Sequence, residues 1–168
     1  AIKCAIDMAC YDIASKAAGM PLYRYLGGET GAVHSDVTIG IGTPDEMAEK
    51  ALEWIEKGFT ILKIKLGEDI ETDLARMEAV RRAAGPSISL RIDANQGWSI
   101  KDSLRIIPEL EGLGVGLIEQ PVAAWDYEGL KEIRQAVRLP IAADESCHSP
   151  MDAARLASMR AVDFINIK

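Results

Sequence analysis

The sequence has few cysteines and no long apolar segment. Its three cysteines, Cys4, Cys10 and Cys147, are odd in number and show no CxxC spacing, so they indicate neither a disulfide framework nor a structural zinc site. We expect them to be reduced, as in a cytoplasmic protein. No apolar run approaches the ~20 residues that a membrane-spanning helix needs, and the first residues lack the charged-then-apolar pattern of a signal peptide. We therefore expect a cytoplasmic protein with no membrane partner.

Basic residues are also in deficit. The chain has 19 lysines and arginines against 26 aspartates and glutamates, a net charge of −7. No basic stripe is present that would neutralise phosphates, so we expect no nucleic acid partner. A G-x-G-x-x-G loop is missing too, which disfavours a doubly wound open sheet that binds a dinucleotide. With 168 residues, 48% of them hydrophobic, the chain can still bury a sizeable core.

What the sequence does contain is one repeated unit. After a helical pattern over residues 2–18 and a further turn over residues 22–26, short apolar segments alternate with helical segments from residue 35 onward. The predicted strands are Val37–Ile41, Ile61–Leu66, Ile88–Asp93, Val115–Glu119, Ile141–Asp144 and Phe164–Lys168. The predicted helices open at Thr43-Pro44 and then cover Asp69–Ala84, Ile100–Leu113, Tyr127–Val137 and Pro150–Met159. Such alternation predicts the α/β class with a parallel sheet, and we expect a partial (β/α) TIM-like barrel of about six strands, since a complete barrel has eight.

Charged residues recur where these strands end. Lys65, Asp93, Glu119, Asp144 and Lys168 follow one another at intervals of 28, 26, 25 and 24 residues, each the length of one strand-helix unit. A barrel builds its active site at the carboxyl ends of its strands, so we expect these side chains to converge. One inward charge alone could be an ion pair of the barrel core, but five at unit spacing favour a site.

The types of side chain indicate a chemistry. Three carboxylates form a hard oxygen site of the kind that suits Mg²⁺. Two lysines on opposite sides could remove a proton from a carbon beside a carboxylate and return it on the other face, which inverts that carbon. Lys63 shares the inward face with Lys65, because strand side chains alternate with a period of two. By the same alternation we expect Arg91 to be a structural counter-charge below Asp93, and we leave Asn166 open.

The chain resembles the muconate-lactonizing subgroup of the enolase superfamily, and within it most resembles the dipeptide epimerases. The matching stretches are IDMACYDIASKAAGMPLYRYLGG, TILKIKLG, LRIDANQGW, LIEQPV, IAADES and VDFINIK. That superfamily uses lysine or histidine bases with Mg²⁺ stabilising an ene-diolate. The resemblance implies metal ligands at Asp93, Glu119 and Asp144 and acid/base lysines at Lys65 and Lys168. It also implies substrate-binding or accessory groups at Lys63, Asn95 and Glu145.

The resemblance also implies a domain organisation and a substrate. Residues 1–34 would be the C-terminal helical part of an α+β capping domain with its linker, and residues 35–168 a partial barrel. Most of the capping domain and strands seven and eight are not in this sequence, so we expect a piece of a longer protein, itself a homo-oligomer. The expected reaction is Mg²⁺-dependent epimerisation of a dipeptide, a small-molecule carboxylate. N-acylamino acid racemase, o-succinylbenzoate synthase and muconate cycloisomerase activities use the same residues and stay open, as does a non-catalytic half-barrel.

Residues near the expected site receive simpler interpretations. Cys147 is expected to be a loop cysteine and His148 to be solvated. Trp98 and Trp125, each just past a strand end, are expected to pack at the edge of the site.

Overall fold

The computed structural model describes residues 2–29 and 33–167. Contacts divide the chain into two units, Ala1–His34 and Ser35–Lys168. The first unit holds helix α1 (Ile2–Ala17) and the short helix α2 (Leu22–Tyr25), each ending one residue earlier than predicted. That this unit is part of a capping domain stays a prediction.

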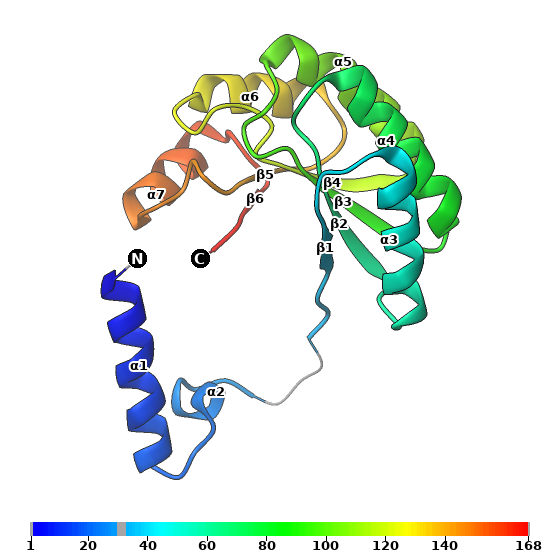
Figure 1. Ribbon diagram of the computed structural model, residues 1–168. Coiled ribbons are helices and arrows are strands. Elements are labelled where there is room, and N and C mark those ends of the chain that lie inside the picture. Colours follow the sequence, from blue (N-terminus) through cyan, green and yellow to red (C-terminus); the bar gives the residue numbers. More distant parts are fainter. Residues whose placement is uncertain (1, 30–32, 168) are drawn as a thin grey trace. The chain divides into compact units, whose positions relative to one another are not determined.

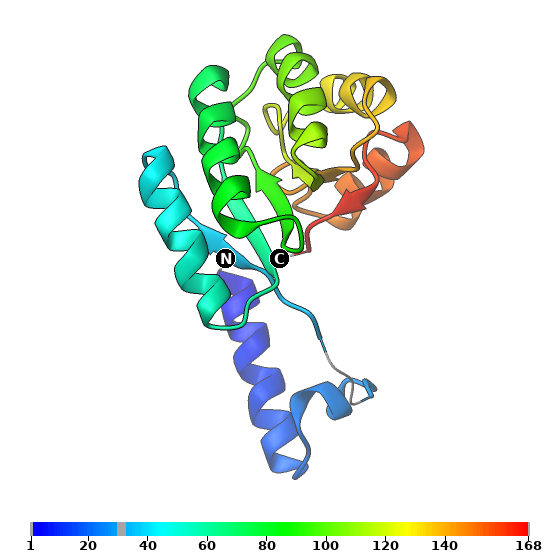
Figure 2. The same cartoon turned by 90° about the vertical axis from the view of Figure 1, so that its right-hand side faces the viewer.

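The second unit is a parallel sheet with helices between its strands (Figure 1). The strands, all parallel and in sequential order, are β1 (Val37–Ile39), β2 (Ile61–Lys65), β3 (Ser89–Asp93), β4 (Val115–Glu119), β5 (Ile141–Ala143) and β6 (Phe164–Ile165). The helices are α3 (Pro44–Glu56), α4 (Ile70–Ala84), α5 (Ile100–Gly112), α6 (Tyr127–Ala136) and α7 (Pro150–Met159). Consecutive helices from α3 to α6 contact one another, and Figures 1 and 2 show the helices on the outer side of the curved sheet. Helices on one face of a sequentially ordered parallel sheet form a partial (β/α) barrel, which confirms the predicted fold class.

Local sequence signals explain where the helices begin. At α3, the Thr43 side chain accepts a hydrogen bond from the Glu46 backbone, and the Glu46 side chain accepts one from the Thr43 backbone at 2.8 Å. This reciprocal pair is a capping box, with Pro44 at the first helical position. Asp69 and Ser149 are the N-caps of α4 and α7, and their side chains accept hydrogen bonds from the backbone N–H of Thr72 and of Asp152.

Strands β2, β3 and β5 are each one residue shorter than predicted, and β1 and β6 are shorter by more than one residue. The expected strand Val37–Ile41 ends at Ile39, where Gly40 and Gly42 interrupt the extended segment. The expected strand that begins at Phe164 ends at Ile165, because its neighbour β5 offers only three strand residues for pairing. Lys168 lies outside the described residues.

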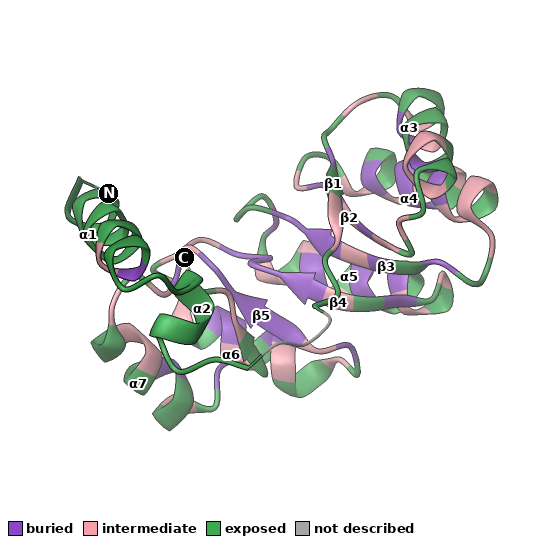
Figure 3. Cartoon of the chain, turned by 90° about the horizontal axis from the view of Figure 1, so that it is seen from below, coloured by how far each residue is buried: buried purple, intermediate pink, exposed green. Residues whose placement is uncertain are grey.

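The sheet packs its core against the helices and turns its charged residues inward. On β2, Leu62, Ile64 and the following Leu66 are buried in the hydrophobic core, whereas Lys63 and Lys65 lie on the other face. Figure 3 shows strands β3 to β5 as mostly buried and the outer faces of the helices as exposed. The predicted alternation on β2 is therefore confirmed. None of the described helices is both long and apolar enough to cross a membrane.

Strand register brings the charged residues to one level. Lys65 pairs with Asp93, and Asp93 pairs with Glu119. The second pairing depends on an irregularity: Leu90 pairs with Val115, but the next residue, Arg91, pairs with Leu117. One residue of β4 is thus extra, as in a β-bulge. Without it, Glu119 would lie one position out of register with Asp93.

Candidate active site

Three buried carboxylates meet at the carboxyl ends of the middle strands. Asp93 ends β3, Glu119 ends β4 and Asp144 directly follows β5. The three residues are only 1%, 6% and 3% exposed, respectively. Each offers an oxygen within 4.8 Å of the oxygens of the other two. Hard oxygen donors at this spacing fit one divalent cation such as Mg²⁺. The structure therefore brings together the three residues expected to be metal ligands.

Two lysines of β2 contact these carboxylates. Lys63 Nζ lies 2.7 Å from Glu119 Oε2 and 2.9 Å from Asp93 Oδ2, and Lys65 Nζ lies 2.7 Å from the same Asp93 oxygen. Burial by itself would lower the pKa of Lys63, but its hydrogen bonds to Glu119 and Asp93 outweigh burial, and the pKa is raised. Burial would raise the pKa of Asp93, but the bonds from Lys65 and Lys63 outweigh it and lower that pKa. Both groups are thus held in their charged forms.

A chain of hydrogen bonds continues outward from Lys65. Its Nζ donates to Asn95 Oδ1 at 2.6 Å, and Asn95 Nδ2 donates to Glu145 Oε1 at 3.0 Å. The backbone of Asn95 adopts a positive φ of 42° and its N–H donates to Asp93 Oδ1 at 3.0 Å. The structure therefore places the two predicted accessory residues beside the predicted base and metal ligand.

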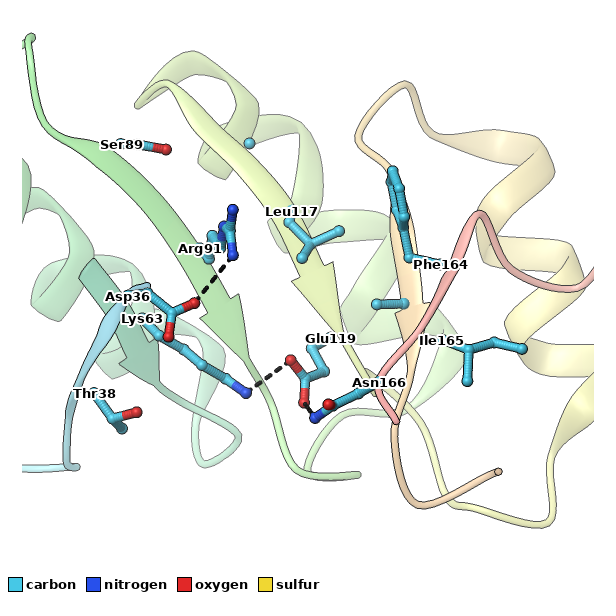
Figure 4. Close-up of a pocket in the computed structure, with 12 residues that line it drawn as sticks. Asp36, Thr38, Lys63, Ser89, Arg91, Leu117, Glu119, Phe164, Ile165 and Asn166 are labelled. Atoms are coloured by element: carbon cyan, nitrogen blue, oxygen red, sulfur yellow. Dashed lines mark hydrogen bonds and ion pairs between the residues drawn. The ribbon is translucent and has the colours of Figure 1, made fainter. Parts of the chain in front are cut away.

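Asn166, left open by the sequence, also reaches the carboxylates. Its Nδ2 donates to Glu119 Oε1 at 3.0 Å, so Glu119 has one oxygen bound by Asn166 and the other by Lys63 (Figure 4). Lys168, two residues further along, is outside the described residues, and its predicted role stays a prediction.

A cavity of about 580 Å³ opens on the inner face of the sheet below these groups. Its lining includes Lys63 and its register partner Arg91, together with Glu119 and Asp36 (Figure 4). Arg91 Nη1 lies 3.1 Å from Asp36 Oδ2, so Arg91 is a counter-charge to Asp36, at the start of the second unit. The charged groups of the site are therefore continuous with the polar inner face of this partial barrel.

A buried aspartate that the sequence did not reveal supports this edge of the sheet. Asp73 of α4 is fully buried and accepts hydrogen bonds from the backbone N–H of Gly67 at 2.9 Å and of Glu68 at 3.1 Å. It also accepts from Trp98 Nε1 at 3.0 Å and from Arg76 at 2.9 Å. It thereby ties the loop after β2 to the loop after β3. In the sequence, Asp73 with Arg76 has the spacing of an ordinary surface ion pair, so no local signal identified it.

Gln120 is a second residue that the sequence did not identify. It directly follows Glu119, is fully buried, and bonds through its side chain to the loop after β5. The only signal in the sequence was its place between a predicted metal ligand and Pro121.

One of the two tryptophans near the site differs from expectation. Trp98 is buried in the core, as a packing residue, and Trp125 is 79% exposed, so the packing role expected for Trp125 is wrong. His148 is exposed, in agreement with the sequence interpretation, and Cys147 is half-buried in the loop after β5.

Comparisons with known proteins show the family to which the chain belongs. The family model described as "Enolase C-terminal domain-like" matches residues 46–168. The L-Ala-D/L-Glu epimerase of Clostridium acetobutylicum is 46% identical over 99% of this chain and 47% of its own length. The hydrophobic dipeptide epimerase of Enterococcus faecalis is 48% identical over 100% of this chain and 48% of its own length.

A solved structure shares the fold as well. The crystal structure of a dipeptide epimerase from Enterococcus faecalis, complexed with Mg and the dipeptide L-Leu-L-Tyr, superposes with a TM-score of 0.94 at 48% identity, over 97% of this chain and 46% of that one. The chain spans about half the length of the curated relatives it matches.

Proposed function

The chain belongs to the enolase C-terminal domain-like family, and from this membership we propose that it is the catalytic part of a Mg²⁺-dependent dipeptide epimerase. The observation that carries the proposal is the cluster of Asp93, Glu119 and Asp144, whose oxygens lie within 4.8 Å of one another, with the Lys65 ammonium 2.7 Å from Asp93. The relatives named as dipeptide epimerases support the choice of substrate class.

The proposed reaction moves one proton at the carbon next to the substrate carboxylate. Asp93, Glu119 and Asp144 would hold Mg²⁺, and the bound cation would stabilise the negative charge that develops on the substrate carboxylate as the proton leaves. Lys63, beside Glu119 and Asp93, would hold that carboxylate by charge.

Two lysines would carry the proton. Lys65 ends β2 and Lys168 follows β6, four strands further along the sheet, so a substrate between them would present opposite faces to the two side chains. One lysine in its neutral form removes the α-proton, which yields an enediolate. The other, protonated, delivers a proton to the opposite face, which inverts the α-carbon. Asn95, bound to Lys65 Nζ at 2.6 Å, would orient the first of these bases.

The test separates the two half-reactions. In the full-length protein, incubated with Mg²⁺ and L-Ala-L-Glu or L-Leu-L-Tyr in deuterated water, we expect Lys65→Ala and Lys168→Ala each to abolish net epimerisation, because inversion needs both lysines. Each variant should still exchange the α-proton of the one epimer served by the remaining base, at a rate measurable by NMR. Loss of the acid/base group should cost ~10²–10⁴ in the rate of the missing half-reaction.

A surface lysine provides the control. Lys101 is exposed on α5, and Lys101→Ala should keep full epimerase activity. The two-base proposal fails if both lysine variants exchange the same epimer, or if either keeps full activity. No activity of the parent on any dipeptide would point instead to the acylamino acid racemase or cycloisomerase reactions.

A further inference from the structure

A fully buried glutamine joins the ends of two neighbouring strands. Gln120 follows Glu119 at the end of β4, and its Oε1 accepts hydrogen bonds from the backbone N–H of Asp144 at 2.9 Å and of Ser146 at 3.1 Å. Its Nε2 donates to Val122 O at 2.9 Å and to Ser146 Oγ at 2.8 Å. Backbone N–H groups can only donate, so these partners fix which way the amide points. All four hydrogen-bonding positions of the side chain are used.

The backbone N–H and carbonyl of Gln120 are hydrogen-bonded as well. Its N–H donates to Ala142 O of β5 at 2.8 Å, and its carbonyl accepts from Gln96 N, in the loop after β3, at 2.8 Å. Its φ is +39°, a left-handed conformation that is unfavourable for a residue with a side chain and persists when surrounding bonds hold it. Gln120 is therefore bonded to both segments that flank its own strand, the ones that carry Asp93 and Asp144.

We propose that Gln120 is a positioning residue that sets the place of Asp144 relative to Glu119 in the metal site; this inference rests on the proposed Mg²⁺ chemistry. Asp144 lies just beyond β5, which ends at Ala143, so regular strand pairing no longer holds it. Gln120 Oε1 supplies the acceptor for its backbone N–H instead. Because Gln120 is bonded directly to Glu119 in the chain, one side chain fixes the separation of two carboxylates.

The effect should be seen in metal affinity. Mg²⁺ demands near-ideal octahedral geometry, so a small displacement of one ligand weakens binding. Partners that orient metal ligands typically contribute 10–100-fold in affinity. Removing the acceptor also leaves two backbone N–H groups without their partner, which loosens the loop that carries Asp144.

The experiment measures the Kd for Mg²⁺ by isothermal titration calorimetry on the full-length protein. Gln120→Met keeps the side-chain length without a hydrogen-bonding group, and we expect its Kd to rise about 10–100-fold. Gln120→Glu keeps an acceptor for the amides of Asp144 and Ser146 but loses the donor to Val122 O, so its Kd should rise clearly less than that of Gln120→Met, since it preserves the two bonds to the loop that carries Asp144. Rescue by this conservative variant is what a general loss of packing would not show.

A matched control lies at the other end of the strands. Arg81 of α4 donates through Nε to Leu113 O at 2.7 Å and through Nη1 to Gly85 O at 2.7 Å, so it too is a multiply bonded side chain that joins loops. Arg81→Met should lower the melting temperature and leave the Kd for Mg²⁺ unchanged. If Arg81→Met weakens Mg²⁺ binding as much as Gln120→Met, general destabilisation explains both and the inference is overturned.

Two further outcomes would overturn the inference. A folded Gln120→Met variant with the Kd of the parent overturns this inference alone and leaves the proposed function intact. A parent protein that binds no Mg²⁺ overturns both. Should Gln120→Met not fold, Gln120→Asn, whose amide stops one methylene short of Asp144, replaces it in the same measurement with the same expectation.

Discussion

At the scale of single residues, Lys63 is the lysine whose ammonium contacts two of the three carboxylates of the site. Its side chain is 15% exposed, and its ammonium lies within 2.9 Å of both Asp93 and Glu119. The raised pKa of Lys63 means that its contribution to stability is complete at neutral pH and is lost only as the pH rises through that pKa. The lowered pKa of Asp93 means that its contribution is lost only as the pH falls through that value. The pair is therefore fully charged between these limits.

Replacing this lysine should destabilise the metal-free protein. Lys63→Met leaves Glu119 without its cation, while Asp93 keeps its contact with Lys65. Breaking a buried pair costs ~3–5 kcal/mol, and because one contact remains we expect a loss of about 2–3 kcal/mol in the free energy of unfolding. Urea unfolding of the full-length protein in EDTA measures it, and Mg²⁺ should recover part of the loss. Equal stability of Lys63→Met and Lys101→Met would contradict this expectation.

The residues differ in how far the sequence could reveal them. Lys65, Asp93, Glu119 and Asp144 recur at the length of one strand-helix unit, so periodicity alone indicated that they converge. Gln120 owes its importance to Asp144, 24 positions away in the chain, and no local pattern encodes that bond. A buried polar residue of this kind acts by positioning residues that are distant in the chain. Its role therefore depends on tertiary structure, and the sequence did not reveal it.

At the scale of elements, helix starts were predictable and strand details were not. Caps such as Thr43 with Pro44 act within a few residues, so their signal is local. Strand length and register depend on the neighbouring strand instead. The extra residue in β4, which brings Glu119 level with Asp93, lies inside an apolar run that looks like any other strand. The site was therefore predicted from spacing, without the bulge that aligns it.

The cap of α3 gives a test at this scale. Thr43→Ala removes the bond to the Glu46 backbone and should lower the free energy of unfolding by about 1 kcal/mol. The backbone hydrogen bond from Thr43, and then its side-chain bond, lower the pKa of Glu46. A depressed carboxyl pKa stabilises the fold above the ordinary value and loses that effect as the pH falls through the lowered one.

The corresponding measurement compares two glutamates of the same helix. In urea unfolding, Glu46→Gln should be less stable than the parent at pH 7, and the difference should shrink towards pH 3. Glu49→Gln, an exposed site on α3, should differ little from the parent at pH 7. A difference for Glu46→Gln that is the same at both pH values would show that the cap does not depend on the carboxylate.

At the scale of the whole molecule, the site is a consequence of topology. In a parallel sheet the carboxyl ends of all strands lie at the same end of the sheet. The ends of β2 to β5 therefore place Lys65, Asp93, Glu119 and Asp144 close together. The alternation of strands and helices sufficed to predict this arrangement. The chain spans about half the length of its curated relatives, so any contact with the substrate outside this chain is a matter of the proposed function.

Metal binding should accordingly stabilise the whole protein. Three carboxylates with oxygens within 4.8 Å of one another repel each other, and a cation bound to the folded state alone raises the free energy of unfolding. The gain is ~2.7 kcal/mol when free Mg²⁺ is 100 times its Kd. We therefore expect Mg²⁺ to raise the melting temperature of the full-length protein by several degrees and EDTA to reverse the rise.

Glu119→Gln should lose the shift because it removes one charged ligand, whereas Glu49→Gln should keep it. A melting temperature of the parent that is indifferent to Mg²⁺, or an undiminished shift in Glu119→Gln, would show that these carboxylates do not form the metal site.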